Sequence, residues 1–219
     1  MTGDIRLESL KREAALLHKA HERGDRQAML QVKQWLGTKE SLKRADFLHA
    51  VARERGIESW PKLKVAVEAE GFDLAEARVR LVQALFFGQK LWVERLLAEF
   101  PKVAEGQFHL ACALYDIDVV RSGLSEDPGL AGRSFGPRRP FLHLCFSRYH
   151  QIAPNRTEDA VRVAELLLEA GADVDDAFPS EPGSDHALSA LYGASGHACH
   201  LGLTELLLEA GANPNDNES

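Results

Sequence analysis

The sequence predicts an all-α fold in which stacked helix pairs follow a separate N-terminal helical module. Two nearly identical segments, 165–173 and 205–213, begin 40 residues apart, as in proteins built from a structural repeat. Apolar residues recur at helical spacing, and a glycine closes several of these runs. Charge also divides the chain: residues 1–70 carry 14 Lys and Arg against 11 Asp and Glu, whereas residues 71–219 carry 12 against 22.

Residues 1–72 predict a module of four helices. The first ends at Gly24, and Asp25 caps the second, which ends at Gly37. The third is expected to open at Ser41 and to end at Gly56. The fourth starts at Ser59-Trp60-Pro61, because proline is tolerated in a first helical turn. The predicted inward residues of the first three helices are Leu7, Leu10, Ala14 and Leu17, then Met29, Val32 and Leu36, then Ala45, Leu48 and Ala52.

Residues 73–219 predict helix pairs that repeat along the chain. Asp73 and Glu76 form a capping box, in which each side chain accepts a hydrogen bond from the other's backbone amide. Stretches rich in Gly, Pro and Asp at 134–140 and 178–185 predict loops between pairs. The four predicted units are 73–105, 106–135, 136–178 and 179–219, the last without a C-terminal cap.

The two duplicated segments predict the end of the second helix in two successive pairs. Leu167 and Leu207 occupy equivalent inward positions. Gly171 and Gly211 stand where a left-handed residue closes a helix at little steric cost. The duplication therefore predicts two units with the same local structure.

These motifs resemble those of ankyrin repeat proteins. Residues 108–112 and 141–145 are similar to the first-helix pattern T-P-L-H-x-A-A, and the duplicated segments are similar to the second-helix pattern V-V-x-L-L-L-x-x-G-A-D. Residues 50–64 resemble a segment, A-R-E-x-G-F-x-S-W-P-x-L-K, that precedes repeats in bacterial ankyrin proteins. Spacings of 27, 44 and 40 residues between equivalent positions depart from the usual 33, which indicates degenerate first repeats and loop insertions later.

The resemblance implies a non-catalytic scaffold that binds a protein partner through hairpin tips and the concave face of the first helices. Two candidate fingers carry charged residues beside an aromatic one: a first finger at 133–139 and a second at 173–185. An insertion at 148–156 adds a third candidate loop. Aromatic and arginine side chains are typical interface anchors. The candidate binding residues are Arg133, Phe135, Arg138, Arg139, Tyr149, Asp175, Asp176, Phe178 and Asp185.

A metal-dependent enzyme is an alternative that the histidines raise. His186, His197 and His200 lie near Cys199, and imidazole and thiolate are zinc ligands. The resemblance implies instead that such histidines pack between repeats, and that His109 and His143 bond across a turn. No Ser/His/Asp or Cys/His pair can be assigned catalytic roles, because Cys112 and Cys145 fall on the packed faces of their predicted helices, and no phosphate-binding loop follows a strand. We therefore expect no enzymatic activity, no cofactor and no metal.

A regulator that contacts nucleic acid through its N-terminal module is the second alternative. Five basic residues surround a helix–turn–helix-like segment at 42–68, and bound phosphates need such groups. Glu54, Glu58 and Glu68 interrupt the positive field, which disfavours this function. The five basic residues are Arg44, Arg53, Arg55, Lys62 and Lys64.

Compartment and chain ends give three further expectations. Cys112, Cys145 and Cys199 have no metal-ligand spacing and predict buried, reduced thiols in a cytoplasmic protein. No apolar run predicts a membrane span, and the first residues lack a signal-peptide pattern. Residues 213–219 predict a hairpin that leads into a further repeat, and since stacked repeats need caps we expect either a longer natural protein or an end that a partner covers.

Overall fold

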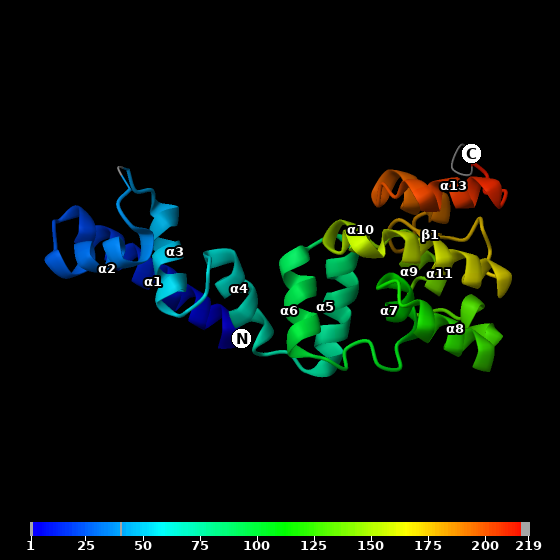
Figure 1. Cartoon of the computed structure of the whole chain (residues 1–219), viewed down its shortest axis with the longest axis horizontal. Coiled ribbons are helices and arrows are strands. Elements are labelled where there is room, and N and C mark those ends of the chain that lie inside the picture. Colours follow the sequence, from blue (N-terminus) through cyan, green and yellow to red (C-terminus); the bar gives the residue numbers. More distant parts are fainter. Residues whose placement is uncertain (1, 40, 216–219) are drawn as a thin grey trace. The chain divides into compact units, whose positions relative to one another are not determined.

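Helices account for most of the residues that the computed structural model describes, which are 2–39 and 41–215, with side chains from residue 6 onward (Figure 1). The predicted all-α class is confirmed, with the addition of one short antiparallel hairpin, Ala177–Pro179 (β1) paired with Ala187–Ser189 (β2). The chain divides into two compact units, Met1–Ala77 with Glu94–Glu99, and Arg78–Val93 with Phe100–Ser219. Among the described helices, none combines the length and apolar character needed to cross a bilayer.

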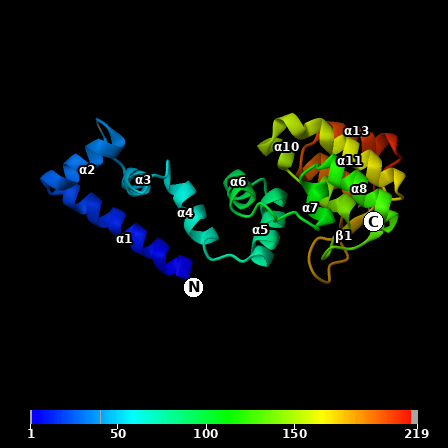
Figure 2. The same cartoon turned by 60° about the horizontal axis from the view of Figure 1, so that its bottom comes forward.

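The first unit is built around a long first helix. Thr2–Glu22 (α1) packs against the three helices that follow it, and Figure 2 shows α2 folding back beside α1. Asp25 caps α2 as predicted, because its Oδ1 accepts a hydrogen bond from Ala28 N at 2.8 Å. Trp60 begins the fourth helix, as the Ser-Trp-Pro signal predicted. The following helices are Arg26–Leu36 (α2), Arg44–Glu54 (α3) and Trp60–Ala69 (α4).

Two residues predicted to face inward in this unit are exposed, although the four inward residues predicted for α1 are all buried. Met29 is 50% exposed, whereas Val32 is buried as predicted, together with Ala28. Ala45 is exposed because α3 buries the face that carries Phe47, whose ring packs 4.4 Å from that of His18. The large aromatic side chain thus determines which face of α3 enters the core.

The start predicted for α3 is wrong, whereas the capping box predicted before Leu74–Phe86 (α5) is present. Helix α3 begins at Arg44 rather than Ser41, because Asp46 accepts a hydrogen bond from Lys43 N at 2.7 Å and fixes the first turn there. The capping box before α5 is confirmed: Asp73 N donates to Glu76 at 2.9 Å, and Glu76 N donates to Asp73 at 2.8 Å.

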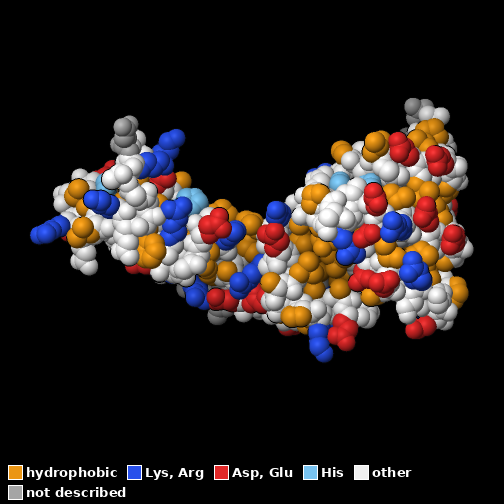
Figure 3. Space-filling view, viewed as in Figure 1, with side chains coloured by type: hydrophobic (Ala, Val, Ile, Leu, Met, Phe, Trp, Pro, Cys, Tyr) orange, Lys and Arg blue, Asp and Glu red, His pale blue; other side chains and the backbone are white. Residues whose placement is uncertain are grey.

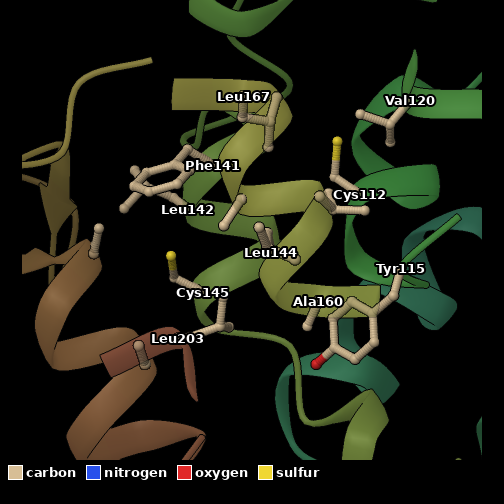
Figure 4. Packing of buried hydrophobic residues seen from close by; sticks show 14 of the residues in the cluster. Cys112, Tyr115, Val120, Phe141, Leu142, Leu144, Cys145, Ala160, Leu167 and Leu203 are labelled. Carbon is tan, nitrogen blue, oxygen red and sulfur yellow. The ribbon is translucent and has the colours of Figure 1, made fainter. Parts of the chain in front are cut away.

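The second unit consists of short helices that pack in layers. Phe108–Ala113 (α7) packs against α8 and α9, and α11 packs against α8, α9 and α13. Figure 4 shows buried side chains from these helices, including Leu142, Leu144 and Leu167, gathered in one core. Leu74–Phe86 (α5) and Lys90–Glu99 (α6) each contribute residues to both units. The remaining elements are Ile117–Glu126 (α8), Pro128–Gly132 (η1), Pro140–Cys145 (α9), Tyr149–Ile152 (α10), Pro154–Arg156 (η2), Thr157–Glu169 (α11), Ala190–Tyr192 (α12), Gly193–His197 (η3) and Leu201–Glu209 (α13).

The duplicated segments have the same local structure, as predicted. Leu167 and Leu207 are fully buried, and each accepts a 2.9 Å hydrogen bond at its carbonyl from the amide five residues ahead. Gly171 and Gly211 between them are left-handed, with φ of +88° and +95°. This is the hydrogen-bond pattern of a Schellman helix end, in which glycine avoids a steric penalty.

Each duplicated segment then ends in the same side-chain turn. Asp173 Oδ1 accepts a hydrogen bond from Asp175 N at 3.0 Å, and Asn213 Oδ1 accepts one from Asn215 N at 3.0 Å. Asp and Asn side chains favour such turns because they hydrogen-bond to the backbone two residues on. The prediction for residues 216–219 lies outside the described residues.

A left-handed residue also separates the two helices in three of the pairs. Gly88 has φ of +63°, Tyr115 +58° and Cys199 +56°. The residue that follows then caps the second helix in two pairs: Asp116 accepts from Val119 N and His200 accepts from Leu203 N, both at 3.2 Å. Glycine adopts this backbone without strain, whereas in Tyr115 and Cys199 the Cβ atom makes the same conformation unfavourable.

The insertion at 148–156 forms α10 and η2 and joins several helix ends. Arg148 N donates to Leu85 O at 3.0 Å, and Arg148 Nε donates to His197 O at 2.9 Å. The ring of His197 in turn lies with Nε2 2.8 Å from Phe86 O. The end of α5 therefore contacts residues that follow α9 and residues at the end of η3.

Candidate protein-binding surface

The first finger is a tight turn that positions Arg138. Phe135 N donates to Arg138 O at 2.8 Å, which forms an isolated antiparallel bridge, and Gly136 between them has φ of +67°. The guanidinium carbon of Arg138 lies 5.0 Å from the ring centroid of Phe86 and 5.4 Å from that of Phe178. Both contacts have the geometry of cation–π interactions. Arg138 of the first finger thus meets Phe178 of the second.

Phe178 belongs to an aromatic cluster that sequence reasoning did not assemble. Phe146, which directly follows α9, is its centre: the ring stacks on Phe86 at 5.6 Å and meets Phe178 edge-on at 5.1 Å. His197 packs 4.1 Å from Phe86 and 5.3 Å from Phe146, and Tyr192 lies 6.3 Å from Phe146. We call Phe86, Phe146, Phe178, Tyr192 and His197 the aromatic cluster.

Glycine and strand pairing make room for this cluster. A Cβ atom at Gly193 would lie 2.5 Å from the Phe146 ring, so a side chain there would displace it. Phe178, predicted in a loop, lies instead on β1 opposite Leu188 of β2 and is half-buried. At the edge of the cluster, Tyr192 is 44% exposed and Phe87 is 59% exposed. The cluster therefore combines a packed interior with a solvent-facing aromatic margin.

Arg139 and Asp176 form an ion pair between the two fingers. Arg139 Nη1 lies 2.5 Å from Asp176 Oδ1, and the Asp176 side chain is only 3% exposed. Asp176 also accepts a hydrogen bond from Ala177 N at 3.0 Å. Burial raises the pKa of Asp176, and the contact with Arg139 offsets only part of that shift.

Other charged candidates bind partners within their own segments or the next. Asp175 Oδ1 accepts a hydrogen bond from Asn213 N at 2.8 Å, which connects the two duplicated segments. Arg133 forms an exposed ion pair with Asp127 at 2.7 Å. Asp185 is exposed in the hairpin between β1 and β2. Tyr149 of α10 makes its ring contact outside the fingers: it packs edge-on against Tyr115, with 5.5 Å between ring centroids.

Two histidines, one buried and one half-buried, support the first finger. His143 Nε2 lies 3.1 Å from Phe135 O. A neutral imidazole that carries its proton on Nε2 can donate a hydrogen bond to this carbonyl oxygen. His109 stacks on Phe135 with 4.8 Å between ring centroids. Burial lowers the pKa of His109 to about 4 and that of His143 to about 3, and the charge of Arg138 adds to both shifts. Both rings are therefore neutral at neutral pH.

The histidines proposed as metal ligands are separated by their contacts. His197 and His200 use ring nitrogens in backbone contacts, with Phe86 O at 2.8 Å and Thr157 O at 3.2 Å. His200 also accepts from Leu203 N, so both of its ring nitrogens are engaged. His186 is exposed in the hairpin between β1 and β2. Within residues 2–39 and 41–215, no group of three potential ligands is close enough to hold a metal ion.

The cysteines do not share one environment. Cys112 and Cys145 are buried as predicted, and burial raises the pKa of each thiol far above its ordinary value. Cys199 is exposed, so the prediction that it is buried is wrong. Its left-handed backbone turns the chain between η3 and α13, where the side chain points away from the core.

The basic residues of the N-terminal module are mostly engaged within that module. Arg55 pairs with Glu13 at 2.6 Å, and Arg53 donates to Trp35 O at 2.6 Å. Lys62 pairs with Glu58, which lies just before α4, and Lys64 pairs with Glu68 one turn further along α4. These contacts reduce the positive field that a phosphate backbone would require.

Comparisons of the chain with protein families, with curated proteins and with solved structures found no match in any of the three. The class of the protein therefore rests on its own residues and geometry.

Proposed function

We propose that residues 73–215 form an ankyrin-like stack, and that the protein is a non-catalytic scaffold that binds a protein partner through its two fingers and the adjoining helix ends. One observation carries the functional part of this proposal: Arg138 of the first finger and Phe178 of the second meet in a partly exposed aromatic cluster. Arginine and aromatic side chains that gather at one surface are the residues that most often dominate protein–protein binding energy.

The repeat assignment is supported by the local structure of the duplicated segments. Their buried leucines, left-handed glycines and side-chain turns have the same hydrogen bonds at matching positions. The link from Asp175 to Asn213 N continues from one segment to the next, as expected for successive repeats. A departure from a simple stack is the contact of Phe86 with His197, because linear repeats touch only their neighbours.

The surface chemistry favours a protein over other partners. The exposed margin of the cluster, Tyr192 and Phe87, supplies apolar area beside polar fingers. Figure 3 shows charged side chains of both signs, interspersed with hydrophobic ones, on the second unit. A mixed surface of this kind suits a partner with its own mixed surface, whereas nucleic acid requires a clustered positive field.

A photo-crosslinking experiment tests the proposal. A photoreactive amino acid at Pro182, exposed in the hairpin between β1 and β2, is compared with one at Glu165, exposed on α11. Crosslinking in cells of the source organism, followed by mass spectrometry, should capture a protein from position 182 and not from position 165. Equal capture from both positions, or from neither, contradicts binding through the fingers.

A further inference from the structure

Arg138 holds a guanidinium whose hydrogen-bond donors are unused. In the described part of the chain, its side chain makes cation–π contacts with Phe86 and Phe178 and no hydrogen bond or ion pair. A guanidinium donates from its edges, in its own plane, so contacts with ring faces leave these donors available. Arg138 is only partly exposed, and a half-buried cation without an acceptor is costly unless an anion joins it.

A second guanidinium borders the same aromatic cluster. Arg148 uses Nε to donate to His197 O at 2.9 Å, and its two terminal nitrogens have no acceptor among the described residues. The positive charges of both Arg148 and Arg138 lower the pKa of His197, after burial as the main cause. The two cations therefore act on one ring of the cluster.

The nearby carboxylates do not neutralise these cations. Asp176 is paired with Arg139, and Asp175 accepts from Asn213 N. Arg133 of the same finger, in contrast, has its own partner in Asp127. His109 and His143 beside the finger are held neutral by burial and by the charge of Arg138. The cluster thus has excess positive charge, apolar walls and open donors.

We propose that Arg138, supported by Arg148, is the receptor for a carboxylate of the partner protein, with an apolar side chain of that partner packed on the exposed margin at Phe87 and Tyr192. This inference rests on the proposed function and specifies the chemistry of the partner. The carboxylate can come from an Asp or Glu side chain or from a chain terminus. In either case the guanidinium binds it with two parallel hydrogen bonds, which a lysine cannot reproduce.

The test is a titration of the full chain with short peptides, followed by the NMR signal of the Arg138 Nε–H group. The probes are a capped Phe-Asp-Leu peptide, its amide counterpart Phe-Asn-Leu, and a Phe-Leu peptide with a free C-terminal carboxylate. We expect the Asp peptide to shift the Arg138 signal saturably at millimolar concentration, with the amide counterpart binding about tenfold or more weakly. The free-terminus peptide distinguishes a terminal from a side-chain carboxylate, and a response to either one supports the proposal.

Matched variants distinguish the paired hydrogen-bond donors of the Arg138 guanidinium from its positive charge. Arg138→Lys keeps the charge and should weaken binding of the carboxylate peptides about tenfold, whereas Arg121→Lys at an exposed position of α8 should leave it unchanged. The wild-type titration needs no variant, so a poorly folded Arg138→Lys protein does not remove the test. Equal, measurable shifts from the Asp and Asn peptides, or no shift from either carboxylate peptide, overturn the inference.

The inference and the proposed function can fail separately. Crosslinking from Pro182 without any carboxylate response at Arg138 overturns the carboxylate receptor and leaves the scaffold function standing. A carboxylate response at Arg138 without crosslinking supports the receptor chemistry and contradicts a partner bound at the finger tips.

Discussion

Arg139 Nη1 contacts Asp176 Oδ1 at 2.5 Å, and this ion pair connects the first finger to the start of the second. The sequence presents an arginine-rich finger and an aspartate-rich finger as two separate candidate binding loops. In the structure, one arginine and one aspartate of these fingers satisfy each other. The Arg139–Asp176 pair therefore positions the fingers, while Arg138 remains available for a partner.

The ion pair can be tested by a double-mutant cycle. Arg139→Ala leaves a buried carboxylate unpaired and should cost about 1–3 kcal/mol, less than a fully buried pair because Arg139 is half-exposed. Asp176→Asn keeps an acceptor for Ala177 N and removes the charge, so Arg139→Ala should cost little in that background. Urea unfolding of the four proteins gives the coupling energy. Additive losses would mean that the two side chains do not interact.

This cycle should also depend on pH. Burial already raises the pKa of Asp176, and removing Arg139 raises it further. A carboxyl group with a raised folded-state pKa is destabilising when ionised, so the penalty of Arg139→Ala is present at neutral pH and lessens as the pH falls through that pKa. Unfolding free energies of the wild type and Arg139→Ala, compared at matched pH values, measure this change.

Equivalent leucines of the duplicated segments should differ in their cost of truncation. Leu167 and Leu207 are both fully buried, but α11 packs between α8 and α13, whereas α13 packs on α11 from one side. Leu167→Ala should therefore cost about 2–5 kcal/mol through lost transfer energy and a cavity, and Leu207→Ala should cost less. Chemical denaturation measures both losses. Equal, small losses would argue against a stacked repeat.

Substitutions at two left-handed backbone positions should change stability in opposite directions, because one position holds glycine and the other cysteine. Gly171→Val should destabilise by about 1–2 kcal/mol, because φ is +88° and no atom lies near the added Cβ to explain the loss by a clash. Cys199→Gly should stabilise by up to about 1 kcal/mol, because strain at φ of +56° outweighs the extra entropy of glycine in the unfolded chain. Thermal unfolding midpoints report both, and a lower midpoint for Cys199→Gly would contradict the strain at this turn.

Stability should fall as the solution is acidified from neutrality. The folded-state pKa values of His109, His143 and His150 are about 4, about 3 and about 4, below the ordinary 6.5, with burial as the main cause. At pH values between the folded-state pKa and 6.5, the unfolded chain binds more protons than the folded chain. Each histidine therefore lowers the free energy of unfolding by up to about 1.4 kcal/mol per pH unit as the pH falls. His143→Gln can still donate to Phe135 O and should flatten this dependence. Identical pH profiles for both proteins would rule out His143 as a source.

Local signals in the sequence predicted local structure well. Asp25 at the start of α2 and the Asp73–Glu76 box at the start of α5 form the predicted hydrogen bonds, because capping needs only residues within one turn. The glycines of the duplicated segments likewise adopt the predicted left-handed backbone. Helix faces were predicted unevenly: the inward residues of α1 are buried as predicted, whereas on α3 Phe47 rather than Ala45 enters the core of the first unit.

The candidate site could not be assembled from spacing alone. Phe86, Phe146 and His197 come from three different helix pairs, and no periodicity indicates which helix ends meet. The sequence did identify Arg138 and Phe178 as candidate binding residues, through composition of the fingers. Their direct contact depends on the turn at Gly136 and on the pairing of β1 with β2, which are tertiary features.

The contact between Phe86 and His197 spans 111 residues of chain, and it changes how the second unit is expected to come apart. A linear array can fray from one end, since each unit depends only on its neighbours. Here the last helix pair holds the end of α5, so opening either one exposes the ring of Phe146 that both cover. Amide hydrogen exchange should accordingly show α5 and α13 losing protection together, as one cooperative block rather than as two independent ends.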